Sequence, residues 1–251
     1  MPHAKRRTLI VNADDFGLSA GVNAGIRRSF LDGVVTSASL MVRQPSAGSA
    51  AAISAEHPGL SVGLHIDLGE WVYRGGEWTP KYEVVDLSDP ASVRNEVEAQ
   101  LDLFRGLLGA DPTHLDSHQH VHLTEPVRGI VREAGERLGV PVRGLEPRIR
   151  YCGEFYGQTG IGQPARELIT TGHLLEIIDR LGDGWTELGC HPGEAHDVES
   201  DYGVERSVEV RTLTDPRIRE GLVSCGVGLA GFGTGQNEVA DPAAMLAGAE
   251  A

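Results

Sequence analysis

Short apolar runs alternate with longer amphipathic stretches along most of this chain. The run Thr8–Ala13 (TLIVNA) is β-branched and apolar, which is typical of a strand buried on both faces. In the stretch Ser92–Leu108, by contrast, apolar residues recur every three or four positions, which is typical of a helix with one face toward a core. Glycine or a Pro-Gly pair follows several of these stretches and marks their ends.

This pattern predicts the following elements. Strands are expected at Thr8–Ala13, Val34–Val42, Ser61–Ile66, His114–Ser117, Val140–Val142, Thr186–Cys190 and Val227–Phe232. Helices are expected between the cap Ser19 and Gly33, and at Ala50–Glu56, Ser92–Leu108, Glu125–Leu138, Gly172–Leu181 and Pro216–Ser224. Long loops are expected at Gly69–Pro90, which lacks a clear period, and at the Gly-rich Ile149–Pro164.

Regular alternation of strands and helices indicates an α/β fold with parallel strands. Roughly seven strands in a chain of this length favour a TIM-like (β/α) barrel, closed or nearly closed, with its active site at the C-terminal rim of the strands. An open doubly wound sheet is the competing architecture. We expect one domain over 1–237, followed by a flexible C-terminal tail over 238–251.

Composition and charge narrow the function. The 36 acidic residues outnumber the 22 Lys and Arg, which gives a net charge of −14 and argues against a nucleic-acid or membrane-surface partner. With 40% hydrophobic residues the chain can bury a substantial core. Three widely spaced cysteines and the absence of a long apolar run favour a cytoplasmic protein. A homodimer is the default oligomer.

Polar residues follow several of the predicted strands at the point where each strand ends. In a β/α barrel these points meet at one rim, so residues far apart in the sequence would form one cluster. The residues concerned are Asp14, Asp15, His65, Asp67, Asp116, His118, His120, His122, Arg143 and His191.

The histidines and acids in this set suggest a metal site. In His118-x-His120-x-His122 two imidazoles can meet one cation whether the segment is extended or helical, although an exposed polar loop would have the same sequence. His65 alone would be interpreted as a core histidine. The histidine cluster and the Asp14-Asp15 pair at the same rim favour a metal-ligand role for it. Two nitrogens and one carboxylate leave open positions for water and substrate.

The doublet Asp14-Asp15 calls for an explanation, because two like charges at the end of an apolar strand repel each other. One carboxylate can bind the metal while the other acts as a base; helix capping is the alternative. His191 is suited to a general acid near neutral pH, or is an ordinary turn histidine. Arg143 could bind an anionic or sugar oxygen, or form an ion pair.

Several of these residues lie in longer motifs that resemble a known family. NADDFGLS at Asn12–Ser19, GLH at Gly63–His65, THLDSHQHVH at Thr113–His122 and CHP at Cys190–Pro192 occur in the order found in the YdjC-like carbohydrate deacetylases. That group contains the chitooligosaccharide deacetylase, and the motifs cover nearly the whole chain.

The resemblance implies an incomplete or seven-stranded barrel, one divalent metal ion and removal of an N-acetyl group from an amino sugar. By motif position, Asp15, His65 and His118 would hold the metal. Asp14 would be the base that activates water, and His191 the proton donor to the leaving amine. The residues expected to contact substrate or to support the ligands are Asp116, His120, His122, Arg143 and Tyr156.

The sequence leaves open which metal binds and which reaction is catalysed. Two nitrogens and a carboxylate suit Zn²⁺, Co²⁺ or Mn²⁺, and the resemblance leaves Mg²⁺ open. A catalytically inactive sugar-binding protein on the same barrel, or a metal-dependent phosphoesterase, would use similar residues. The phosphoesterase would need further ligands and a basic pocket.

Overall fold

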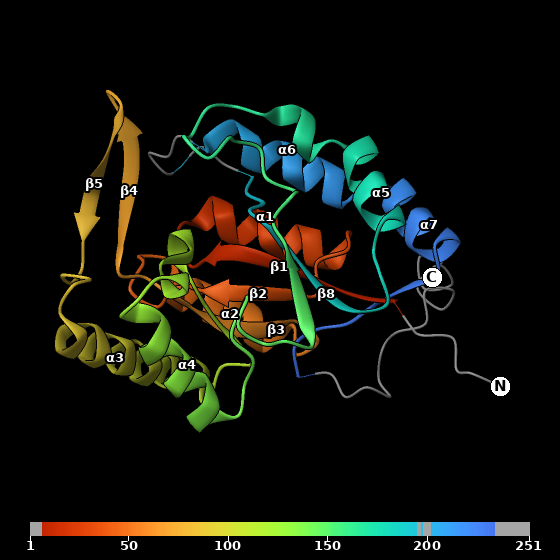
Figure 1. Ribbon diagram of the computed structural model, residues 1–251. Helices are drawn as coiled ribbons and strands as arrows, with labels where there is room; N and C mark the ends of the chain where they lie inside the picture. Colours follow the sequence, from red (N-terminus) through yellow and green to blue (C-terminus); the bar gives the residue numbers. More distant parts are fainter. Residues whose placement is uncertain (1–6, 195–196, 198–201, 234–251) are drawn as a thin grey trace.

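A computed structural model describes residues 7–194, 197 and 202–233. The predicted tail over 238–251 lies outside the described residues. The central feature is a curved parallel sheet with helices packed around it (Figure 1). Its strands are β1 (Arg7–Phe16), β2 (Ser37–Leu40), β3 (Ser61–Ile66), β6 (Leu115–Ser117), β7 (Ile149–Cys152), β8 (Gly184–Cys190) and β9 (Val227–Leu229).

The strands are ordered β6-β3-β2-β1-β8-β7, and β9 also pairs with β1. Every pairing in this sheet is parallel, as the alternating pattern predicts. The sheet is an incomplete β/α barrel, so the predicted fold class is confirmed. In β1, the central strand, Ala13 is level with both Ala38 and Cys190, which brings the ends of three strands together.

Helices cover the outer surface of this sheet (Figure 1). They are α1 (Ala20–Leu31), α2 (Ala47–Glu56), α3 (Pro90–Leu108), α4 (Val127–Leu138), α5 (Thr171–Asp179), α6 (Gly203–Leu213) and α7 (Pro216–Ser224), with short 3-10 turns η1 (His118–Leu123) and η2 (Arg166–Ile169). Ser19 caps α1 by accepting a hydrogen bond from the Val22 N–H, and Gly109 ends α3 with φ at 68°, both as predicted. None of the helices in the described part of the chain is long and apolar enough to span a bilayer.

Three predictions about elements are wrong. The loop predicted at Gly69–Pro90 contains an antiparallel hairpin, β4 (Gly69–Arg74) and β5 (Glu77–Glu83), which Figure 1 shows beside the main body. The loop predicted at Ile149–Pro164 begins with strand β7, while the strand predicted at Val140–Val142 is a single bridge between Val142 and Leu115.

Helix α6 was not predicted, because charged residues form much of its inner side. Glu205, Arg206 and Glu209 are all buried, so the segment shows no apolar stripe. This helix and the hairpin both turn out to contribute residues to the polar end of the sheet.

Candidate active site

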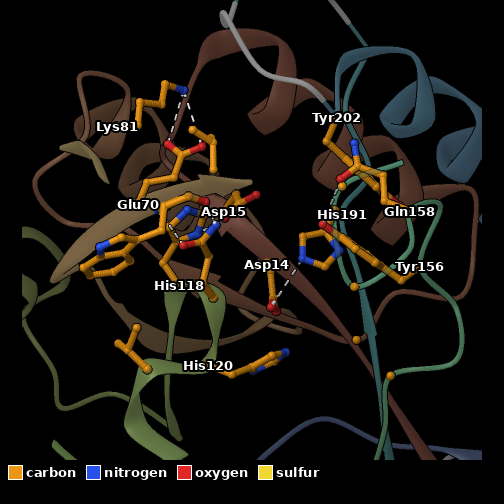
Figure 2. Close-up of a pocket in the computed structure, with 18 of the residues that line it drawn as sticks. Asp14, Asp15, Glu70, Lys81, His118, His120, Tyr156, Gln158, His191 and Tyr202 are labelled. Carbon is orange, nitrogen blue, oxygen red and sulfur yellow. Dashed lines mark hydrogen bonds and ion pairs between the residues drawn. The ribbon is translucent and has the colours of Figure 1, made fainter. Parts of the chain in front are cut away.

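The end of β1 places Asp14 and Asp15 at the rim of the sheet. Both side chains are buried, and Asp15 has a positive φ of 66°, a left-handed conformation that is unusual for a residue with a side chain. This local reversal directs the two consecutive carboxylates to different partners. Figure 2 shows Asp15 beside His118 and Asp14 toward His191.

Asp15 forms a cluster with two imidazoles. Its Oδ1 lies 3.5 Å from His65 Nε2 and 3.3 Å from His118 Nδ1. Within the described residues, this buried oxygen has no hydrogen-bond partner. One oxygen and two nitrogens facing a common point match the ligand set of a divalent cation, and the residues present therefore fit a metal ion.

Asp116 fixes the orientation of the His65 ring. Its Nδ1 lies 2.8 Å from Asp116 Oδ1, and since a carboxylate can only accept, Nδ1 carries the proton. Nε2 is then the atom that faces Asp15. Burial alone would lower the pKa of His65, but the carboxylates of Asp116 and Asp14 raise it well above its ordinary value. Protons therefore compete with a cation for Nε2.

Asp15 is itself oriented by α6. Arg206 donates to Asp15 Oδ2 at 2.6 Å, which leaves Oδ1 for the cluster. Burial opposes ionisation, but the Arg206 guanidinium and the nearby imidazoles of His118 and His65 hold the pKa of Asp15 well below its usual range. The carboxylate is therefore charged at neutral pH.

Asp14 is held by Arg143, whose two terminal nitrogens lie 2.6 and 2.7 Å from its oxygens. Arg143 also pairs with Asp116 at 2.8 Å and with Glu187 at 2.6 Å. Against the effect of burial, Arg143 lowers the pKa of Asp14. The side chain of Arg143 is fully buried, so the structure supports an ion-pair role for this residue and places it behind the cavity wall.

His191 follows β8 and faces Asp14. Its Nε2 lies 3.7 Å from Asp14 Oδ2, and Nδ1 has no hydrogen-bond partner in the described part of the chain. The His191 backbone N–H donates to Glu209 at 2.5 Å. Burial lowers the pKa of His191 to about 4 even though Asp14 and Asp15 act in the opposite direction. The free imidazole is therefore neutral at pH 7.

The other predicted residues take separate places. His120 lines the cavity, with Nε2 3.3 Å from the Tyr151 hydroxyl. His122 is buried: its Nε2 donates to the Arg143 carbonyl, and its Nδ1 accepts from Ser117. The sequence left open which of these two histidines approaches the metal ligands. In the structure neither belongs to the group formed by Asp15, His65 and His118.

These side chains line one cavity of about 820 Å³, a size typical of small-molecule sites. Tyr156 lies in its wall, with its ring centroid 5.1 Å from that of His191 and 4.7 Å from that of Tyr202. The hairpin forms another part of the wall, and Figure 2 shows its residues Glu70 and Lys81 on the side of Asp15 and His118.

Sequence reasoning missed four residues that shape the site. These are Glu187, Tyr202, Arg206 and Glu209. Glu187 carried a usable signal, because it is an acidic residue inside the predicted strand Thr186–Cys190, and strands of a parallel sheet are usually buried on both faces. Glu209 accepts hydrogen bonds from the His191 backbone and from the Tyr202 hydroxyl, and burial raises its pKa to about 8.

A carboxylate and two imidazoles at the rim of an incomplete β/α barrel, next to a second carboxylate and a further histidine, are the features of a metal-dependent hydrolase. Comparison with known sequences agrees with this class. Residues 8–224 match the family described as YdjC-like protein, and the chain belongs to that family.

Its relatives include a carbohydrate deacetylase of Geobacillus stearothermophilus, 36% identical over 89% of this chain and 96% of that protein. A chitooligosaccharide deacetylase of Serratia marcescens is 32% identical over 90% of this chain and 98% of that protein.

Solved structures support the fold. A protein of Enterococcus faecalis described as a putative cellobiose-phosphate cleavage protein has a TM-score of 0.74 at 24% identity, covering 91% of this chain and 98% of that chain. A family 4 carbohydrate esterase of Streptomyces lividans, solved with acetate, has a TM-score of 0.52 at 13% identity, covering 94% and 98% of the two chains.

Proposed function

We propose that this protein is a metal-dependent carbohydrate deacetylase that removes the N-acetyl group from an N-acetylated amino sugar or a short chitooligosaccharide. Membership of the YdjC-like family and the names of its relatives support the substrate class. The observation that carries the chemistry is the buried Asp15 Oδ1, unpartnered in the described structure and facing His65 Nε2 and His118 Nδ1.

Asp15, His65 and His118 would hold one divalent cation. Two nitrogens and one carboxylate oxygen are compatible with Zn²⁺, Co²⁺ or Mn²⁺, and Mg²⁺ is the cation with the strongest preference for oxygen among those considered. A cation at this position would polarise the acetyl carbonyl and increase the acidity of a water molecule. Its proposed ligands come from β1, β3 and η1, three elements that the sheet brings together.

Asp14 would act as the base. Arg143 keeps it ionised and fixes its orientation, so the carboxylate can accept a proton from the attacking water. The water oxygen forms a bond to the acetyl carbon, and the C–N bond then breaks. The products are acetate and the free amino sugar.

His191 would supply the proton that the leaving nitrogen needs. A neutral imidazole cannot donate it to an amine without first gaining one. Because Nε2 lies 3.7 Å from Asp14 Oδ2, the proton removed from water can pass from Asp14 to His191 and then to the amine. The low pKa of His191, about 4 in the buried site, makes its protonated form a strong acid.

Acetate release from N-acetylated mono- and oligosaccharides tests this function. We expect turnover to stop with a chelator and to return when Zn²⁺ or Co²⁺ is added. Asp14→Asn should keep the bound metal, measured by elemental analysis, and should lose about 10²- to 10⁴-fold in kcat. Asp15→Asn should lose the metal as well.

Two results would contradict the proposal. Activity that is indifferent to chelation would remove the metal from the reaction. Full activity of Asp14→Asn would remove this carboxylate from the role of base, whatever the metal content.

A further inference from the structure

The hairpin β4–β5 carries aromatic side chains along one of its faces. Trp71 and Tyr73 are two residues apart on β4, and Tyr73 is level with Trp78 on β5, so alternation places all three on the same face. All three line the cavity that contains Asp15 and His118. This face of the hairpin therefore belongs to the candidate active site.

Two of these aromatics are costly to leave in water. Trp78 is 54% exposed and Tyr73 is 36% exposed, with ring centroids 5.5 Å apart. A two-stranded ribbon has little stability of its own and gains none from leaving such surface unburied. Exposed aromatic surface inside a cavity is typical of a ligand-binding site.

The hairpin is held in a fixed relation to the proposed metal ligands. Gln119, the residue after His118, accepts a hydrogen bond from the Trp71 N–H and donates one to the Trp71 carbonyl, both at 2.8 Å. The Tyr82 hydroxyl lies 3.0 Å from both carboxylate oxygens of Asp67, at the end of β3. The aromatic face is thus positioned before any ligand arrives.

The spacing along the hairpin suits a chain of sugar rings. Tyr73 and its neighbour Trp78 lie roughly 7 Å along the hairpin from Trp71, the residue bonded to Gln119, because two strand residues advance by that amount. This step is comparable with the advance of one ring along an oligosaccharide. A cavity of about 820 Å³ lies toward the upper end of the usual range for small ligands, so it has room for more than one ring.

We propose that Tyr73 and Trp78 form a second sugar-binding site, which stacks against the apolar face of the ring next to the acetylated residue. This inference rests on the proposed deacetylase function and deepens it: the enzyme would act preferentially on a disaccharide or longer substrate. Glu70 and Lys81, which also line the cavity, form an ion pair 3.2 Å apart, so together they present no net charge to a neutral sugar.

The test compares N-acetylglucosamine with its β-1,4-linked disaccharide as substrates, using the full-length protein. The measured quantity is the ratio of the two kcat/KM values. We expect the wild type to favour the disaccharide, and Trp78→Ala and Tyr73→Ala to reduce that ratio by about tenfold, the value of one aromatic contact. Trp78→Phe, which keeps a ring, should retain most of the preference.

Thr79→Ala is the matched control, because Thr79 is the next residue on β5 and its side chain is on the other face. It should leave the ratio unchanged. A ratio unchanged by Trp78→Ala, or an equal loss with Thr79→Ala, would overturn the proposal. So would a loss that is the same for both sugars, because that would indicate a structural role.

Failure of the proposed deacetylase function can be distinguished from failure of the second sugar-binding site. If the wild type releases no acetate from either sugar, the deacetylase assignment fails, and calorimetric titration with the disaccharide then decides the second site. Binding that Trp78→Ala weakens about tenfold, and Thr79→Ala does not, supports it. Absence of binding, or equal binding by wild type and Trp78→Ala, overturns it.

Discussion

Arg143 connects three carboxylates of the candidate site. One guanidinium pairs with the carboxylates of Asp14, Asp116 and Glu187, and all four side chains are buried. Charges of this kind remain in an interior only when each is paired. Against the effect of burial, Arg143 and His65 hold the pKa of Asp116 well below its usual range, so Asp116 can accept the proton on His65 Nδ1.

The contact between Asp116 and His65 leads to a prediction for metal affinity. Asp116→Asn removes the charge that selects the His65 tautomer, so we expect a divalent cation to bind about 10- to 100-fold more weakly. Titration calorimetry with Zn²⁺ or Co²⁺ measures this change. Asp32→Asn, at an exposed carboxylate on the surface, controls for the loss of one negative charge. Equal affinities for the two variants would contradict the prediction.

At the scale of single residues, the sequence predicted the candidate-site residues that directly follow or end a strand. Asp14, Asp15, His65, His118 and His191 were all predicted, because parallel strands bring their C-terminal ends together whatever lies between them. It could not identify Arg206 or Glu209. These residues occur on a helix whose pattern is not amphipathic. The partner of Arg206 is 191 positions away in the sequence, and that of Glu209 is 18 positions away.

Among the elements, α1 and the segment after β8 make an unusually close contact. A Cβ at Gly25 would lie 2.4 Å from the Gly193 Cα, closer than atoms can approach. Gly193 is two residues after His191, so the absence of a side chain at Gly25 allows this segment to reach its place. The position of His191 therefore depends on the packing of a helix that carries none of the proposed catalytic groups.

Gly25→Ala should displace that segment. We expect at least a tenfold loss of kcat and a destabilisation of about 1–3 kcal/mol from overpacking. Gly48→Ala is the matched control, because a methyl group on Gly48 in helix α2 meets open space and should stabilise the protein by about 0.5–1 kcal/mol. Urea unfolding and acetate release measure both effects. A Gly25→Ala variant that behaves like Gly48→Ala would show that the contact can relax freely.

The elements that sequence patterns predicted are those with apolar runs or stripes. The hairpin escaped prediction because charged residues and a proline interrupt its apolar pattern, although Gly75-Gly76, both with positive φ, is a typical hairpin turn. Helix α6 shows no apolar face in its sequence, because its buried residues include Glu205, Arg206 and Glu209, whose polar partners lie in other parts of the fold.

At the scale of the whole molecule, buried neutral histidines link folding to pH. His114 is completely buried; its Nε2 lies 3.0 Å from Ser39 Oγ, and its ring stacks on Phe232. Burial lowers the pKa of His114 from 6.5 to about 4. Between these pH values His114 is protonated in the unfolded chain but not in the folded protein. The free energy of unfolding therefore falls as pH falls through this window.

This effect can be measured on the metal-free protein. Between pH 7 and pH 5, His114 should account for a loss of about 2 kcal/mol in the free energy of unfolding. Urea unfolding of wild type and His114→Gln at both pH values gives this difference. The wild type should lose more stability than the variant, and equal losses would contradict the prediction. The buried carboxylates with lowered pKa values act at more acidic pH, outside this interval.

Asp14 and Asp15 are consecutive residues, so a single peptide unit fixes the separation of the Cα atoms that carry the proposed base and one proposed ligand. No hinge or domain rotation can alter that spacing. The hairpin, in contrast, lies outside the main sheet, and in the described structure Gln119 and Asp67 bond to it. New substrate preferences could therefore be introduced by exchanging hairpins between relatives, while the hydrolytic apparatus is inherited unchanged.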